Sequence, residues 1–180
     1  MERDGLLSLA PDRRIQLTAQ GQELAESVMR KHRLAERLLT DVIGLDWELV
    51  HAEACRWEHV ISEDVERRLV NVLNKPTISP YGNPIPGLDG LGIDVEAEKN
   101  TFPRLAEIPM GQEMDVRIHA LGEQVQSDSD FFHTICELDV SPGFPAKVKR
   151  IGHTVTLTTD KGTIEIDQDK AHAIRIEVTE

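Results

Sequence analysis

Two stretches, KHRLAERLL (residues 31–39) and HAEACRWEH (residues 51–59), hold six potential metal ligands within 28 residues. In each stretch two of the ligands stand four residues apart: His32 and Glu36, then His51 and Cys55. Side chains four residues apart on a helix lie one turn above another on the same face. The spacing therefore predicts two helices that carry one or two metal sites, and metal sensing or storage becomes the first functional hypothesis.

The donor set limits which metal can bind. A thiolate, imidazoles and carboxylates favour a transition metal over Mg²⁺ or Ca²⁺, which prefer oxygen ligands. The paired CxxC ligands typical of a closed structural zinc site do not occur in the sequence. Fe²⁺, Mn²⁺, Co²⁺ and Ni²⁺ all stay open, with Zn²⁺ as a further substitute. Two ligand groups are geometrically natural: His32, Glu36 and His51 in one, and Cys55, Glu58 and His59 in the other.

An enzymatic interpretation competes with the metal site. Cys55 with His51 or His59 could act as a thiol–imidazole pair in nucleophilic catalysis. However, the ligands crowd one face, and no glycine-rich oxyanion loop accompanies them. A single His, Glu or Cys in such a pattern is most often a surface or packing residue. The six residues together favour a metal site, and we expect a protein that is not an enzyme.

The chain around these stretches is predicted to be helical as far as residue 74. Thr18 is a candidate N-cap for a helix that ends at Gly44, and Asp46 opens a second helix that runs to about Ile61. Ser62 caps a third helix over residues 63–74. Its apolar stripe of Val65, Leu69, Val72 and Leu73 either packs in the core or, with the flank of the first helix, forms a dimer contact. Residues 1–17 read as a short strand pair around the turn formers Pro11 and Asp12.

Beyond residue 74 the pattern changes. Four prolines and four glycines in residues 75–92 predict a segment without regular structure. A period of two then marks five short strands, in MDVRIHAL (114–121), AKVKRI (146–151), TVTLTT (154–159), TIEID (163–167) and AIRIEV (173–178). A short helix over residues 127–138, opened by Ser127 or Ser129, interrupts them. We expect an α+β chain with a small, partly open β-barrel at its C-terminus.

Composition sets outer limits on the function. The 180 residues carry a formal net charge of −12, of which −8 falls on residues 93–180 (17 acidic against 9 basic). An acidic chain is a poor non-specific nucleic-acid binder, so any DNA contact belongs to the N-terminal half. No apolar run is long enough to span a membrane, and no secretory signal opens the chain. With two cysteines only, a reducing cytoplasm fits.

Several stretches resemble the diphtheria toxin repressor family of iron-dependent transcriptional regulators: MERDGL (1–6), VMRKHRLAERLL (28–39), HAEACRWEHV (51–60), SEDVERRLV (62–70) and SPYGNPIPGL (79–88). The resemblance implies a winged helix that binds operator DNA, a helical domain that binds metal and forms a homodimer, and an SH3-like β-domain. It implies the boundaries 1–22 for the wing, 23–93 for the helical domain, 94–108 for a linker and 109–180 for the SH3-like domain.

The resemblance also implies roles for single residues. His32, Glu36 and His51, with Glu123 and Gln126 of the SH3-like domain, match the ancillary metal site. Cys55, Glu58 and His59 match the primary, activating site, and Arg33, Ser79 and Asn83 match an anion contact. Arg3 and Arg13 are candidates for contacts with the DNA backbone. Fe²⁺ or Mn²⁺ is the expected metal.

One departure from the family concerns the start of the chain. In the family, MERDGL follows the recognition helix, so the resemblance places the helix-turn-helix, and a methionine of the primary site, before residue 1. We therefore expect a truncated core that senses metal and dimerises, with operator binding only if the N-terminal region is supplied. The alternative is a metal-buffering or dominant-negative dimerisation module. In either case the primary site is expected to be weaker than the ancillary site.

Overall fold

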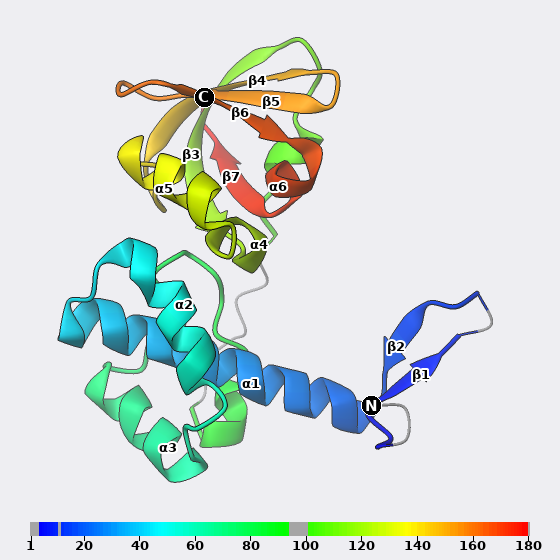
Figure 1. Ribbon diagram of the computed structural model, residues 1–180, viewed down its shortest axis with the longest axis vertical. Coiled ribbons are helices and arrows are strands. Elements are labelled where there is room, and N and C mark those ends of the chain that lie inside the picture. Colours follow the sequence, from blue (N-terminus) through cyan, green and yellow to red (C-terminus); the bar gives the residue numbers. More distant parts are fainter. Residues whose placement is uncertain (1–3, 11, 94–100, 180) are drawn as a thin grey trace.

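The computed structural model describes residues 4–10, 12–93 and 101–179. A helical part and a sheet part are stacked along the long axis of the molecule, and an N-terminal hairpin projects from one end of the longest helix (Figure 1). This arrangement has the α+β character that the sequence predicts. Arg3 and the predicted linker residues 94–100 lie outside the described residues.

The hairpin consists of β1 (Leu7–Leu9) and β2 (Ile15–Leu17), paired antiparallel. Its turn holds Arg13 at a φ of 66°, a left-handed conformation that non-glycine residues seldom adopt. The hairpin is joined closely to the helix that follows, because a Cβ on Gly21 would lie 1.8 Å from the Leu6 carbonyl oxygen. Any larger residue at position 21 would separate the two elements.

Helix α1 (Ala19–Leu38) begins where the sequence predicts, since the Thr18 side chain accepts a hydrogen bond from the Gly21 amide at 3.1 Å. A π-helical turn, η1 (Leu39–Ile43), extends it. Gly44 then ends the helix in the left-handed conformation at a φ of 71°. This glycine reverses the chain, so that the next helix packs beside α1 (Figure 1).

Helix α2 (Trp47–Trp57) starts after Asp46 as predicted, although the Asp46 side chain makes no capping hydrogen bond. The predicted end at Ile61 was wrong. The helix stops four residues earlier because the amides of Val60 and Ile61 both donate to the Trp57 carbonyl and tighten the chain into a turn. Helix α3 (Glu63–Val72) follows, capped by Ser62, and ends two residues before the predicted boundary.

The segment 75–92 is irregular over most of its length, as its prolines and glycines predict. The exceptions are one 3₁₀ turn, η2 (Leu88–Leu91), and a bridge between Ile78 and Pro84. The segment packs onto the sheet part, where the Leu121 amide donates to the Tyr81 carbonyl at 2.9 Å. The backbone at Gly82 approaches His119 so closely that a Cβ there would lie 2.1 Å from the His119 carbonyl oxygen.

The sheet part contains the five predicted strands in one antiparallel sheet of order β6-β5-β4-β3-β7. Its elements are η3 (Leu105–Glu107), β3 (Glu113–Leu121), β4 (Pro145–Ile151), β5 (Thr154–Thr158), β6 (Thr163–Asp167) and β7 (Ile174–Val178). Inward residues alternate along the strands, as in TVTLT, where Val155 and Leu157 are buried. One apolar core joins this sheet to α1 and α2.

Three short helices complete the sheet part. Helix α5 (Ser129–Glu137) was predicted, but its N-cap is Asp128 and not Ser127 or Ser129, because the Asp128 carboxylate accepts from the Phe131 amide at 3.2 Å. Helices α4 (Glu123–Gln126) and α6 (Gln168–His172) were not predicted, since four or five residues are too few for a helical period to be visible. No helix within the described ranges combines the length and apolar character needed to cross a bilayer.

Candidate metal centre

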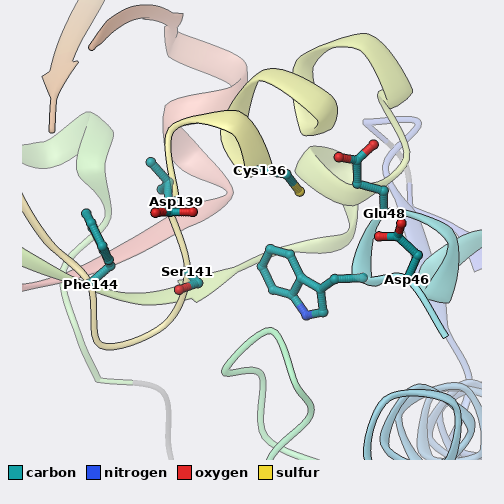
Figure 2. A pocket seen from close by; sticks show the side chains of 8 residues that line it. Asp46, Glu48, Cys136, Asp139, Ser141 and Phe144 are labelled. Carbon is teal, nitrogen blue, oxygen red and sulfur yellow. The ribbon is translucent and has the colours of Figure 1, made fainter. Parts of the chain in front are cut away.

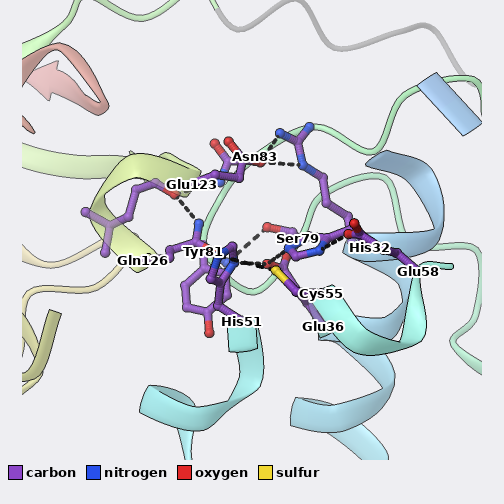
Figure 3. A network of polar contacts seen from close by, with 12 residues as sticks. His32, Glu36, His51, Cys55, Glu58, Ser79, Tyr81, Asn83, Glu123 and Gln126 are labelled. Carbon is purple, nitrogen blue, oxygen red and sulfur yellow. Dashed lines mark hydrogen bonds and ion pairs between the residues drawn. The ribbon is translucent and has the colours of Figure 1, made fainter. Parts of the chain in front are cut away.

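The predicted ligands meet where α1 and α2 face each other. His32 and Glu36 lie one turn apart on α1, and His51 and Cys55 lie one turn apart on α2 (Figure 3). His32, Glu36 and His51 are buried, with 2%, 1% and 8% of their surface exposed. Buried ionisable side chains at such a junction need partners, so their contacts decide what the site can do.

His32 lies between two carboxylates. Its Nε2 is 2.8 Å from Glu36 Oε1, and its Nδ1 is 2.7 Å from Glu58 Oε2. Burial opposes the charged imidazolium, but the hydrogen bonds and charges of Glu36 and Glu58 outweigh it, so the pKa of His32 is raised. Burial likewise opposes the Glu36 carboxylate, and contacts with His32 and His51 overcome it, so the pKa of Glu36 is lowered.

A second set of contacts connects His51 with Cys55. His51 Nε2 is 3.7 Å from the Cys55 Sγ, and the His32 and His51 rings meet edge to face at a centroid distance of 5.0 Å. One ligand atom from each of His32, His51 and Cys55 lies within 4.8 Å of the others. Burial, followed by the charges of Glu58 and Glu36, raises the pKa of the Cys55 thiol. A nearby cation would reverse that preference.

The residues present fit a divalent metal ion. Glu36 Oε2 and His51 Nδ1 are buried atoms without a hydrogen-bond partner. Buried polar atoms are nearly always bonded, so two such atoms beside a second imidazole, that of His32, and a thiol point to a missing cationic partner. Ligands about 2.0–2.3 Å from one metal ion lie roughly 3–4 Å apart, so small side-chain rotations would bring this set into coordination.

The structure groups the ligands differently from the two predicted sites. Cys55, predicted with Glu58 and His59, lies with His51 and His32. Glu58 contacts His32, and His59 is exposed on 68% of its side chain with Nε2 at 3.2 Å from Glu58 Oε1. The assignment of Cys55, Glu58 and His59 to a separate primary site therefore stays a prediction.

The two ligands predicted on the sheet part occupy α4 at the junction with the helices (Figure 3). Glu123 Oε1 is 2.5 Å from Arg33 Nη2 and 3.2 Å from Arg33 Nε, so it is engaged in an ion pair. Gln126 is buried and donates through Nε2 to the Leu121 carbonyl at 2.6 Å, whereas its Oε1 has no partner. Neither residue belongs to the cluster of His32, His51 and Cys55.

The three predicted anion-contact residues lie near this junction, and each already makes hydrogen bonds to other protein groups. Arg33 also donates to the Pro84 carbonyl, in addition to its pair with Glu123. The Ser79 hydroxyl accepts from the Tyr81 amide at 3.2 Å, and Asn83 Nδ2 donates to the Leu121 carbonyl at 2.7 Å. Their assignment as an anion contact stays a prediction.

The sequence reasoning missed the residues that hold the two parts together. The Leu121 carbonyl accepts from both Asn83 and Gln126, and the Tyr81 hydroxyl donates to the Trp47 carbonyl at 2.9 Å. Tyr81, Trp47 and Phe132 pack with ring centroids 4.7–5.7 Å apart. The sole tyrosine of the chain, placed among prolines, was the available signal.

Comparison with known proteins shows the family of this chain. Residues 18–87 match the family model described as iron dependent repressor, metal binding and dimerisation domain. Residues 101–178 match the diphtheria toxin repressor SH3 domain. The chain belongs to the iron-dependent repressor family that includes the diphtheria toxin repressor. Members of this family are transcriptional regulators and not enzymes, as the sequence indicated.

Individual members of the iron-dependent repressor family are similar over nearly the whole chain. The iron-dependent repressor IdeR of Mycobacterium tuberculosis is 51% identical, over 98% of this chain and 79% of the relative. The diphtheria toxin repressor of Corynebacterium diphtheriae is 49% identical, over 98% of this chain and 78% of the relative. The homologues are metal-dependent transcriptional repressors, so metal dependence is a property of the family to which this chain belongs.

Solved structures of metal-dependent regulators share the fold. IdeR of T. acidophilum has a TM-score of 0.75 at 29% identity, covering 99% of this chain and 78% of that structure. The manganese regulator SloR has a TM-score of 0.78 at 22% identity, with 99% and 79% covered, and it supports the fold alone.

Proposed function

We propose that this chain is the metal-sensing and dimerising core of an iron- or manganese-dependent repressor. The observation that carries the proposal is the buried cluster of His32, Glu36 and His51, with Cys55 beside it, inside the region that matches a metal-binding and dimerisation domain. Mixed nitrogen, oxygen and sulfur donors suit Fe²⁺ or Mn²⁺, and Co²⁺, Ni²⁺ or Zn²⁺ could substitute for them.

In the proposed mechanism the chain's own residues change partners. A bound divalent ion would supply positive charge that replaces the proton shared by His32 and Glu36. Glu36 would then use its unpartnered Oε2, and His51 its unpartnered Nδ1, as donors. We propose that Glu123 leaves Arg33 and, with Gln126, completes the site from the sheet part. The ligand set would thereby fix the sheet part against the helices.

This fixation would act as a population shift. A ligand favours the conformation for which it has the higher affinity, by the ratio of the two affinities. Five ligands drawn from α1, α2 and α4 (His32, Glu36, His51, Glu123, Gln126) can bind together only when the parts are docked. Metal therefore stabilises the docked form, and this is the form in which we expect the protein to act.

We further propose that metal binds more tightly to the His32 group than to Cys55, Glu58 and His59. His59 is exposed, and Glu58 is already bonded to His32. Competition titration of His32→Ala against Cys55→Ala tests this order. A larger loss of affinity from Cys55→Ala would contradict it.

The matched domain supports a homodimer, and two faces compete as its contact. The predicted face on α3 exposes Val65 and Val72, at 46% and 64%, while Leu69 is buried in the core. A second face exposes Val42, Ile43 and Leu49 at 54–58%. It flanks an apolar hollow of about 300 Å³ lined by Leu39, Ile43, Leu45, Leu49, Ala52, Glu53, Arg56 and Trp57.

We propose that the second face supplies most of the dimer contact, because exposed apolar patches of this kind mark interaction sites. Leu49→Glu should lower the dimer fraction in sedimentation equilibrium at least tenfold, while Val72→Glu should change it little. Equal loss from both variants would assign the contact to both faces, and loss from Val72→Glu alone would restore the α3 prediction.

We propose that the hairpin before α1 contributes phosphate contacts to DNA binding. Within the described residues before α1, the chain forms a hairpin, whose exposed Arg13 could contact phosphate. Phosphate contacts position a protein on DNA but carry no direct sequence information. The alternative, a module that buffers metal or forms inactive mixed dimers, predicts mixed dimers with a relative that carries a helix-turn-helix and no operator binding alone.

Metal titration with sedimentation equilibrium tests the proposed function. We expect anaerobic Fe²⁺ or Mn²⁺ to bind saturably and to stabilise the dimer. Two ions per chain would support both predicted sites, and one ion per chain, abolished by His51→Ala, would support the His32 group alone. No saturable binding would contradict the proposal.

A further inference from the structure

A polar pocket of about 450 Å³ lies beside the domain junction, outside the cluster of metal ligands. Its walls come from helix α6, the start of β7, the turn into α4 and the chain before η3, elements that adjoin in the sheet part (Figure 1). The lining residues are Asn83, Arg104, Gly122, Gln124, Asp169, His172, Ala173 and Arg175. The volume falls within the usual range of ligand pockets, about 300–1,000 Å³.

Two arginines face each other across one wall of the pocket. Arg104 and Arg175 form an antiparallel β-bridge, which places residues directly opposite. Side chains of directly opposite residues lie on the same face of a strand pair, and like charges in such a pair destabilise it. The bridge therefore starts both arginine side chains on one face of the strand pair, where an anion bound by both would offset their repulsion.

No carboxylate in the described residues forms an ion pair with either guanidinium, although Glu107 accepts from the Arg104 backbone amide at 3.0 Å and Asp169 lines the pocket. Arg104, His172 and Arg175 appear in no ion pair there, although the chain carries a net charge of −12. The contrast with α1 is direct, because Arg30, Arg33 and Arg37 each pair with a carboxylate at 2.5–2.7 Å. Arg117 and Arg150 of the sheet part also form no ion pair in the described residues, but only Arg104 and Arg175 are direct partners in a β-bridge and line this pocket together.

The cationic groups are held in place by other bonds. Arg175 Nη1 donates to the Phe102 carbonyl at 2.6 Å, and Arg104 Nη1 lies 3.4 Å from His172 Nδ1. Each guanidinium carries five N–H donors in a fixed fork, so most donors stay available. Such preorganised donors suit the planar or tetrahedral oxygens of carboxylates and phosphates.

We propose that this pocket binds a small oxyanion with two or more negative charges, of the phosphate or polycarboxylate class. Arg104 and Arg175 would hold its oxygens, with His172 as a third donor. Asp169 is the one carboxylate on the lining, so a monovalent anion gains little net attraction there. The charge balance therefore favours multivalent anions.

This pocket is distinct from the anion contact implied by the family resemblance. Of Arg33, Ser79 and Asn83, only Asn83 lines it, and its Nδ2 is committed to the Leu121 carbonyl. Arg33 is held by Glu123 and Pro84. The two sites can therefore be separated by mutation.

Titration of the ¹⁵N-labelled full chain with sodium phosphate tests the proposal, without added metal and with sodium chloride holding ionic strength constant. We expect saturable shifts of the Gly122, Gln124 and Ala173 amide resonances. Arg104→Gln should weaken binding by about 10- to 100-fold, the value of one charge-assisted hydrogen bond. A parallel titration with citrate shows whether the pocket prefers a phosphate or a polycarboxylate. Saturable binding of either anion supports the proposed site.

Three variants besides Arg104→Gln show whether the anion binds in this pocket. Arg150→Gln is the matched control, since Arg150 also bonds a backbone carbonyl of the sheet part (Ala106, at 2.7 Å) but does not line the pocket. It should bind as the wild type does. His172→Gln should weaken binding without loss of the Arg175 anchor. The proposal would be overturned if neither phosphate nor citrate shifted these resonances. It would also be overturned if Arg33→Gln abolished binding while Arg104→Gln left it intact.

Discussion

The helical half and the sheet half of the proposed metal site are built in opposite ways. On α1 and α2, His32, Glu36 and His51 are buried and in mutual contact, and Glu36 Oε2 and His51 Nδ1 make no hydrogen bond. On α4, Glu123 is engaged by Arg33, and Gln126 is bonded through its Nε2 to a backbone carbonyl. In the helical half a metal ion has to replace only a proton shared between two of its own ligands, His32 and Glu36. In the sheet half Glu123 must leave Arg33 before it can bind metal.

Because of this difference, the two halves should contribute differently to metal affinity and to the coupling between metal binding and docking of the two parts. Ligands that already contact one another lose little freedom on binding, so the helical half should supply most of the metal affinity. The sheet half should supply less, because releasing Glu123 from Arg33 offsets what its new bond contributes. The sheet half should mainly stabilise the docked arrangement of the two parts. The fraction of docked molecules is what a metal sensor has to change.

The largest expected effect comes from breaking the helical half. Glu36→Gln keeps the shape of the side chain but removes the buried charge that faces both histidines. We expect Mn²⁺ affinity to fall by about 100-fold or more, measured by competition with a chelating dye. Gln126→Ala on the sheet half should cost about tenfold or less. Equal losses would contradict the division of roles.

The pH dependence of thermal stability measures how much the charged form of His32 stabilises the helical half. Its pKa is raised in the folded chain, so its ion pairs stabilise the metal-free protein fully below its unfolded pKa. That stabilisation is lost as pH rises through the folded pKa. Metal-free wild type should therefore lose thermal stability relative to His32→Gln as pH rises above about 6.5, the ordinary pKa of histidine. A difference between the two proteins that stays constant with pH would argue against charged His32 pairs.

The smallest effect should come from freeing the sheet half. Arg33→Met releases Glu123, and we expect Mn²⁺ affinity to rise by a few fold, since a part-exposed ion pair is worth about 1 kcal/mol or less. Arg37→Met is the matched control, because Arg37 pairs with Asp41 one turn along the same helix. A loss of affinity in Arg33→Met, absent from Arg37→Met, would show that Arg33 assists binding.

The same two halves differ in how far the sequence predicts them. The spacing of His32 with Glu36 and of His51 with Cys55 indicates shared helix faces, and Gly44 marks the reversal that brings the helices together. The period of two predicts all five strands. These features are local, so a window of a few residues contains them.

What escaped prediction depends on contacts between distant residues. Arg33 and Glu123 are 90 positions apart, and nothing in the sequence around either indicates that they pair. The placement of Cys55 beside His32 depends on how α1 and α2 pack, which spacing on one helix does not set. Helix α4 owes its position to the Gly122 amide, which donates to Ala173 across the sheet part at 2.7 Å.

The most direct test of the partner exchange is a crystal structure of the chain with Mn²⁺, the metal located by its anomalous scattering. We predict one ion among His32, Glu36 and His51, with Glu123 bound to it and separated from Arg33. An ion held only by Cys55, Glu58 and His59, or an occupied His32 site with Glu123 still paired to Arg33, would contradict that exchange.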